Sequence, residues 1–172
     1  MILATCFVLV GFSNAQLAAA AQAQVGVTTS YRPDYVKLKY PGGDVPISTG
    51  VCTDVIVRAF RKGGVDLQVL VHEDMSQNFR AYPAKWGLKK PDRNIDHRRV
   101  PNLQTYFRRQ GYELRNKPFQ AGDVVSWRLP NGRDHIGIVT TPPLAVHNIG
   151  AGAREENVIH EWPITGHYRW KW

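Results

Sequence analysis

The stretch "GVCTDVIVRAF", residues 50–60, is the most informative part of this 172-residue chain. Its apolar residues recur at the spacing of one helix face: Val55, Ile56, Ala59 and Phe60. Gly63 and Gly64 follow as a stop signal. The sequence therefore predicts a helix over residues 52–62 with Cys52 at its start. If the first two dozen residues are removed on export, Cys52 is the only cysteine that remains.

The N-terminus has the layout of a secretory signal peptide. An apolar run over residues 1–10 leads into small residues with A-x-A patterns near Ala21 and Ala23. No Lys or Arg precedes the run, which points to a start codon further upstream. The run is about half the ~20 residues that a membrane-spanning helix needs. We expect residues 1–23 to be a signal peptide and residues 24–172 to be a single exported domain, without an integral membrane segment.

The formal net charge is +8, and no charged residue falls within residues 1–23. The basic residues are spread along the rest of the chain and form no nucleic-acid-binding motif. A basic surface on an exported protein suits an acidic polymer such as bacterial cell wall. We therefore expect no nucleic-acid partner, and we expect the protein to act as a monomer.

The first half of the chain is predicted to be mainly helical and the second half to be strands. Two further helices are expected, one from an N-cap at Asp66 through Met75 and one from Pro101 to Gly111. Residues 82–99 are polar and read as a loop. Strands are predicted within residues 35–41, 123–129, 134–140, 144–150, 157–162 and 167–172, and Asn131-Gly132 predicts a hairpin turn. This order indicates an α+β domain with helices packed on an antiparallel sheet.

Cys52 is the first candidate for chemistry. The N–H groups and dipole of a helix N-terminus favour a thiolate, so we expect the pKa of Cys52 to fall below the usual value of about 8.5. A free cysteine is often only a small buried apolar residue. An unpaired thiol in an oxidising compartment is nevertheless a liability, which favours the nucleophile.

Two histidines on predicted strands could serve this nucleophile. His135 and His147 are in phase on strands joined by a short turn, so both rings can share one face of the sheet. Asp134 is a rival orienting group, but it faces the other way. Gly137 leaves space beside His135 for the cysteine helix or a substrate. His72 and His97 are expected to face solvent. Zinc bound by the same Cys-His-His set is the competing interpretation, and no close-spaced ligand pair supports it.

Four motifs in order, "GVCTDVIVRAF", "FQAGDVVSW", "DHIGIV" and "AVHNIG", resemble the NlpC-like branch of the papain-like cysteine peptidases, which are bacterial cell-wall hydrolases. The pattern is similar to that of an uncharacterised bacterial domain-of-unknown-function group within this superfamily. The resemblance implies a papain-like fold with Cys52 as nucleophile, His135 as general base and His147 as orienting residue. It implies no cofactor and no metal. This chain differs in having Thr53-Asp54 after the cysteine and a polar insert over residues 81–99.

The resulting hypothesis is an exported cysteine hydrolase that cleaves amide bonds in peptidoglycan stem peptides, in the periplasm or cell envelope. Substrate-binding roles are predicted, on weaker grounds, for Asp54 and for three basic residues of the insert: Arg93, Arg98 and Arg99. A solvated basic loop is an equally good interpretation of the insert. Two alternative functions stay open: an N-acetylmuramoyl-L-alanine-type amidase with the same triad, and a non-catalytic cell-wall binding module.

Overall fold

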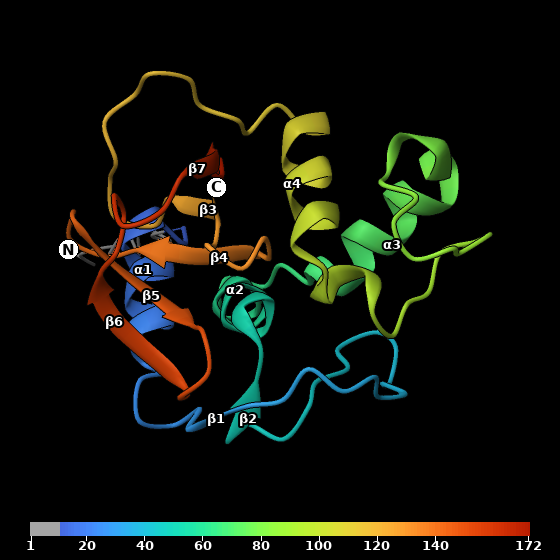
Figure 1. Cartoon of the computed structure of the whole chain (residues 1–172), viewed down its shortest axis with the longest axis horizontal. Coiled ribbons are helices and arrows are strands. Elements are labelled where there is room, and N and C mark those ends of the chain that lie inside the picture. Colours follow the sequence, from blue (N-terminus) through green and yellow to red (C-terminus); the bar gives the residue numbers. More distant parts are fainter. Residues whose placement is uncertain (1–10) are drawn as a thin grey trace, which may run out of the picture.

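The computed structural model describes residues 11–172, and the apolar run over residues 1–10 lies outside the described residues. The helices are α1 (Asn14–Gln22), α2 (Cys52–Lys62), α3 (Leu67–Asn78) and α4 (Val100–Arg109), with short 3-10 turns at Phe79–Ala81 (η1) and Asp96–Arg98 (η2). The strands are β1 (Ser30–Tyr31), β2 (Thr49–Gly50), β3 (Val124–Arg128), β4 (Asp134–Val139), β5 (Leu144–Asn148), β6 (Ala153–Asn157) and β7 (Ile164–Tyr168). The predicted α+β class is confirmed (Figure 1).

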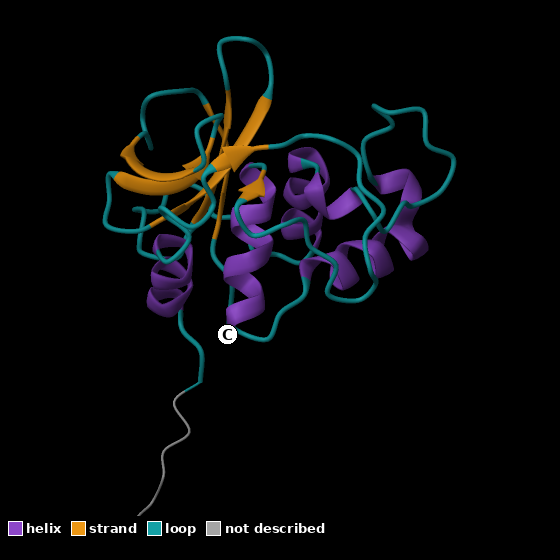
Figure 2. Ribbon diagram, turned by 90° about the horizontal axis from the view of Figure 1, so that it is seen from below, coloured by secondary structure: helices purple, strands orange, loops and turns teal. Residues whose placement is uncertain are grey.

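One antiparallel sheet in the order β6-β5-β4-β3-β7 forms the centre of the domain. Because side chains alternate along a strand, each strand contributes to both faces. The face that includes Ile136, Ile138 and Val146 packs with the helices in the larger apolar core. Figure 2 shows the helices gathered on one side of the sheet. The other face carries Trp127 and Val139 in a second, smaller core that loops cover.

Helix α2 has the bounds that its sequence predicts. Its first turn is capped by Asp54, whose carboxylate accepts a hydrogen bond of 2.7 Å from the N–H of Val51. Its last turn closes with a bond from the Gly63 N–H to the Phe60 carbonyl. Between these ends Val55, Ile56 and Phe60 are fully buried. Helices α3 and α4 also lie where they are predicted, and Asp66 caps α3 by accepting from the N–H of Gln68.

Three strand predictions need correction. Residues 35–41 form no strand, because the segment is held by a side chain instead: the Asn94 amide oxygen accepts from the N–H of Leu38. The strand predicted at 157–162 lies earlier, at Ala153–Asn157, where charged residues suit an edge strand. Val158 and Ile159 are instead buried in the smaller core. The last strand ends at Tyr168 rather than continuing to residue 172.

Helix α1 lies inside the segment that the sequence assigns to the signal peptide. Leu17 and Ala21 are fully buried and belong to the larger core. The Asn14 side chain donates to the Trp170 carbonyl, and the Gln22 side chain donates to Glu155. Cleavage near Ala23 would remove this helix and expose the core beneath it, which counts against that position. Within residues 11–172 no helix combines the length and apolar character needed to cross a bilayer.

Candidate active site

Cys52 lies where β4 and β5 separate. These strands pair only at Ile138–Val146 and Val139–Ala145, so the backbone of Ile136 is free of β5. The Ile136 N–H lies close enough to the sulfur of Cys52 to lower the pKa of the thiol in part. Across the gap, the fully buried Asn148 on β5 donates a 3.0 Å hydrogen bond to the Gly50 carbonyl, just before α2. The two strands thus hold the start of α2, and the sulfur of Cys52 lies beside the β4 residue that follows His135.

His135 and His147 are in contact, as their phase on the strands predicts. His135 Nε2 lies 2.9 Å from His147 Nδ1, and the rings are nearly perpendicular. On the far side, His147 Nε2 lies 3.0 Å from a carboxylate oxygen of Glu156 on β6, although it is not aligned as a regular hydrogen bond. A carboxylate at this distance favours the proton on Nε2 of His147. Nδ1 of His147 then accepts from His135, which leaves Nδ1 of His135 as the free base.

Two indole rings enclose the histidine pair. Trp127 is fully buried, stacks on His135 with centroids 5.7 Å apart, and donates its N–H to the Ile159 carbonyl. Trp162 meets both imidazoles edge to face at about 6 Å. Gly137 serves this packing, because a Cβ there would lie 3.1 Å from Trp127 and 3.2 Å from His147. The space that Gly137 leaves is therefore for the histidine and the indole, not for the cysteine helix.

The expected low pKa of Cys52 is wrong for the resting structure. Burial raises the pKa of the thiol to about 12, and the N–H of Ile136 offsets this only in part. Burial, with His147 nearby, lowers the pKa of His135 to about 3. Both effects favour neutral partners. The resting site therefore holds a thiol and a neutral imidazole rather than a thiolate–imidazolium pair.

Alkylation of Cys52 is expected to be slow at neutral pH. Because the thiolate is the reacting form, the rate should rise with pH and reach its midpoint above the free-thiol value of about 8.5. Iodoacetamide labelling across pH, read at the peptide that contains Cys52, measures this. The urea-unfolded chain is the control and should show a midpoint near 8.5. A folded-state midpoint below 8 would show that a standing thiolate is present.

The thiol and the base open into two neighbouring cavities. A cavity of about 410 Å³ is lined by Cys52, and one of about 430 Å³ is lined by His135. Tyr31, Arg133 and Asp134 line both cavities. These three residues form the rim that the two cavities share. Tyr31 is paired with Gly50 in the short β1–β2 ladder, and burial, with the nearby Cys52 as a second cause, raises the pKa of its phenol.

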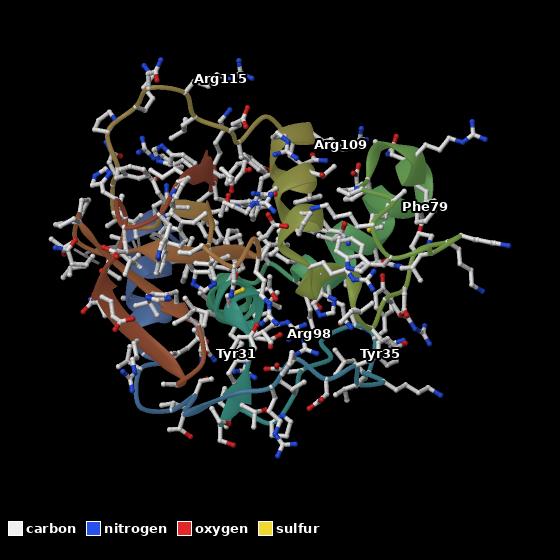
Figure 3. The ribbon with its side chains drawn as sticks, in the orientation of Figure 1. Tyr31, Tyr35, Phe79, Arg98, Arg109 and Arg115 are labelled. Atoms are coloured by element: carbon white, nitrogen blue, oxygen red, sulfur yellow. The ribbon has the colours of Figure 1, made fainter. Side chains whose placement is uncertain are left out.

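Asp54 and Arg98, both predicted to bind substrate, form an ion pair with each other. Their side chains are 5% and 2% exposed and form a bidentate ion pair of 2.9 and 3.0 Å. Arg98 also donates to the carbonyls of Arg32 and Asp34. Figure 3 shows Arg98 and Tyr31 beside α2. The pair holds the start of α2, and Arg98 also lines the cavity in front of Cys52.

The other two predicted arginines differ from each other. Arg93 lies against the ring of Tyr40 and lines a separate cavity away from Cys52. Arg99 does line the Cys52 cavity, with its guanidinium 4.1 Å above the ring of Trp86. The sequence analysis missed Tyr31 and the other basic residues of this cavity, Lys85, Arg128 and Arg133. The sequence offered a signal for Arg128 and Arg133 alone, since both lie in the predicted hairpin that leads to His135.

Asp134 does not contact the histidines and instead pairs with Lys85 and Arg128. His97, expected in solvent, is buried, and burial lowers its pKa to about 3; His72 is half-buried. Among the described residues, no three or more His, Cys, Asp or Glu side chains are arranged to hold a metal ion.

The fold is of the papain-like NlpC/p60 type. It resembles the NlpC/p60 domain of the peptidoglycan hydrolase SagA, with a TM-score of 0.51 and 15% identity over 92% of this chain and all of that one. It also resembles NlpC1 from Trichomonas vaginalis, with a TM-score of 0.51 and 13% identity over 91% of this chain, which spans 43% of that protein.

The chain belongs to the family described as "Domain of unknown function (DUF1287)", whose model matches residues 18–170. It is 54% identical over 171 residues to the "Uncharacterized protein YijF" of Escherichia coli (strain K12), covering 92% of this chain and 82% of that protein. The resemblance deduced from the four sequence motifs is confirmed at the level of fold and family.

Proposed function

We propose that this protein is an exported cysteine hydrolase that cleaves an amide bond in peptidoglycan stem peptides. The observation that carries the proposal is the array of Cys52, His135 and His147, in which the thiol lies beside the strand of a base that a second histidine orients. The fold of peptidoglycan hydrolases supports it. The basic cavity in front of Cys52 suits an acidic polymer.

The chemistry follows from the two neutral partners. As the sulfur of Cys52 attacks the carbonyl carbon, its proton moves to Nδ1 of His135, which then gives it to the leaving amine. The amide C–N bond breaks and a thioester forms. Water then attacks the thioester carbonyl carbon while His135 accepts the water proton. The C–S bond breaks, the peptide leaves with a new carboxyl group, and the proton returns from His135 to the sulfur. Burial raises the pKa of Cys52, so the base must act during the attack rather than before it.

The developing oxyanion needs donors near Cys52. The N–H of Cys52 at the start of α2 is one donor, where the helix dipole adds to its effect. The phenol of Tyr31, at the rim of both cavities, is the second donor that we propose. The same rim carries the exposed Arg133, which can grip a substrate carboxylate bidentately.

The test is digestion of purified bacterial sacculi by the reduced protein, with mass spectrometry of the released fragments. Wild type should release muropeptides, and Cys52→Ala should release none. Activity should survive EDTA and fall as salt rises, because salt screens attraction between exposed charges. Loss in EDTA with recovery on adding zinc would replace the thiol mechanism by a metal one. Saturable binding without product would favour a binding module.

The masses of the fragments also separate the two enzyme functions. Cleavage within the stem yields fragments that keep amino acids on the sugar. An amidase would release free stem peptides and sugar chains without amino acids. We favour the peptide bond because the Cys52 cavity is lined by several cations and one carboxylate, which suits a substrate with several carboxyl groups.

Export is part of this proposal, and α1 bears on where processing occurs. The small residues Ser13 and Ala15 also fit a cleavage signal, and a cut after Ala15 keeps Leu17 and Ala21 in the core while giving up the contact of Asn14 with Trp170. The family match begins at residue 18, inside α1. We therefore expect the exported protein to begin at Gln16. Intact-mass measurement of protein from the bacterial envelope checks this, and a chain beginning at Gln24 would contradict it.

A further inference from the structure

A second, more apolar hollow adjoins the Cys52 cavity. Its volume is about 250 Å³, and it lies between the end of α3, η1 and the start of the polar insert. The carbon-rich part of its wall is formed by Met75, Phe79, Tyr82, Pro83 and Leu88. Phe79, labelled in Figure 3, marks its position at the end of α3. Trp86 and Arg99 line this hollow and the Cys52 cavity alike, so the two cavities lie side by side.

The hollow is lined by a buried amide that lacks a partner. Asn102 is fully buried, its Nδ2 donates to the Asp96 carbonyl at 3.1 Å, and its Oδ1 has no partner among the described residues. The assignment of oxygen and nitrogen is fixed, because the reverse would set two carbonyl oxygens against each other. A buried acceptor without a donor is costly, so an N–H from an occupant would be favourable here.

Two cations flank the same hollow. Arg99 reaches Asp96 only through Nη1, at 3.4 Å, and its other guanidinium nitrogens have no partner within residues 11–172. Arg80 is exposed and forms no ion pair or hydrogen bond with a described residue. A carboxylate at this place would be held by charge-assisted hydrogen bonds. The hollow thus offers an acceptor, an apolar wall and a site for an anion.

We propose that this hollow binds the C-terminal residue of the peptide substrate. The N–H of that residue donates to Asn102 Oδ1, its aliphatic side chain packs on the apolar wall, and its free carboxylate binds Arg99 and Arg80. A plain hydrocarbon chain would leave Asn102 and the arginines unsatisfied, and a sugar would not use the apolar wall. The inference rests on the proposed function, since the bond to be cleaved would lie in the neighbouring cavity.

The test uses binding rather than turnover, so that it stands apart from the hydrolase proposal. Ligand-observed NMR on the full chain carrying Cys52→Ala would compare N-acetyl-leucine with its C-terminal amide and its N-methyl derivative. The acid should bind at millimolar concentration. The amide lacks the carboxylate and the N-methyl form lacks the donor, so each should bind at least tenfold more weakly. Equal binding of acid and amide, or no binding of the acid, would overturn the proposal.

A pair of variants locates the binding. Ala84 is exposed and lines the hollow, so Ala84→Trp should fill it and abolish binding. Ala81 is also exposed but does not line the hollow, so Ala81→Trp should bind like the parent. Thermal unfolding of both variants checks that they fold. Binding that persists in Ala84→Trp would place the ligand elsewhere and overturn the proposal. Binding of the acid by a wild-type chain that cannot digest sacculi would count against the hydrolase alone.

Discussion

His135→Ala is expected to reduce muropeptide release by about 10³-fold or more, which is near the upper range for loss of a general acid–base group. Without the imidazole the buried thiol keeps its proton, because burial raises its pKa to about 12. Product release from sacculi at pH 7 measures the loss. Raising the pH toward 10 should restore part of the activity of this variant, since solvent hydroxide can then remove the proton. Unchanged activity at pH 7 would show that His135 is not the base.

His147→Ala should cost less than His135→Ala, because His147 orients His135 and transfers no proton itself. Glu156→Ala tests the same arrangement one step further out. Loss of this carboxylate frees His147 to change tautomer, so the pH profile should change more than the affinity for sacculi. Glu155→Ala, on the same strand, should leave the profile unchanged. His160→Ala is the matched histidine control, since His160 is exposed and outside the site.

The sequence predicted those parts of the fold whose signals are local. A few neighbouring residues are enough to predict three features: helix α2 with its apolar face and glycine stop, the N-cap at Asp66, and the hairpin turn at Gly132. The edge strand β6 was misplaced, because its charged residues show no apolar alternation and it pairs on one side only. Helix α1 was hidden in an Ala-rich segment that is equally typical of a signal peptide. Leu17 and Ala21 of this helix are buried in the same core as α2, and a contact between distant segments cannot be predicted from a local sequence pattern.

In the candidate site, too, the features with local signals could be predicted and those that depend on distant residues could not. The contact of His135 with His147 could be predicted because strand phase is local and the turn between them is short. The raised pKa of Cys52 could not be predicted, since it depends on burial by elements that are distant in the sequence. The ion pair of Asp54 with Arg98 joins residues 44 positions apart, so the sequence could not show that these charges satisfy each other. Tyr31 reaches the site through a two-residue strand too short to leave a pattern.

Breaking the Asp54–Arg98 pair is expected to have the largest effect on stability. Removing one partner leaves the other charge buried and unpaired, which costs about 3–5 kcal/mol of unfolding free energy. For a domain of this size the melting temperature should fall by roughly 10 °C. Asp54→Ala and Arg98→Met, measured by thermal and urea unfolding, test this. Arg115→Ala is the matched control, because the Arg115 side chain is 86% exposed in its ion pair with Glu113 (Figure 3). This variant should have the melting temperature of the wild type.

The double variant Asp54→Leu with Arg98→Met separates stability from catalysis. Removing both charges eliminates the unpaired ion, so much of the lost stability should return. Activity should stay low, because the N–H of Val51 has lost its acceptor and the start of α2 no longer holds Cys52 against β4. The loss should therefore fall on kcat rather than KM for a soluble muropeptide. If Arg98→Met instead melted like wild type and raised KM alone, Arg98 would be a substrate-binding residue, as the sequence predicted.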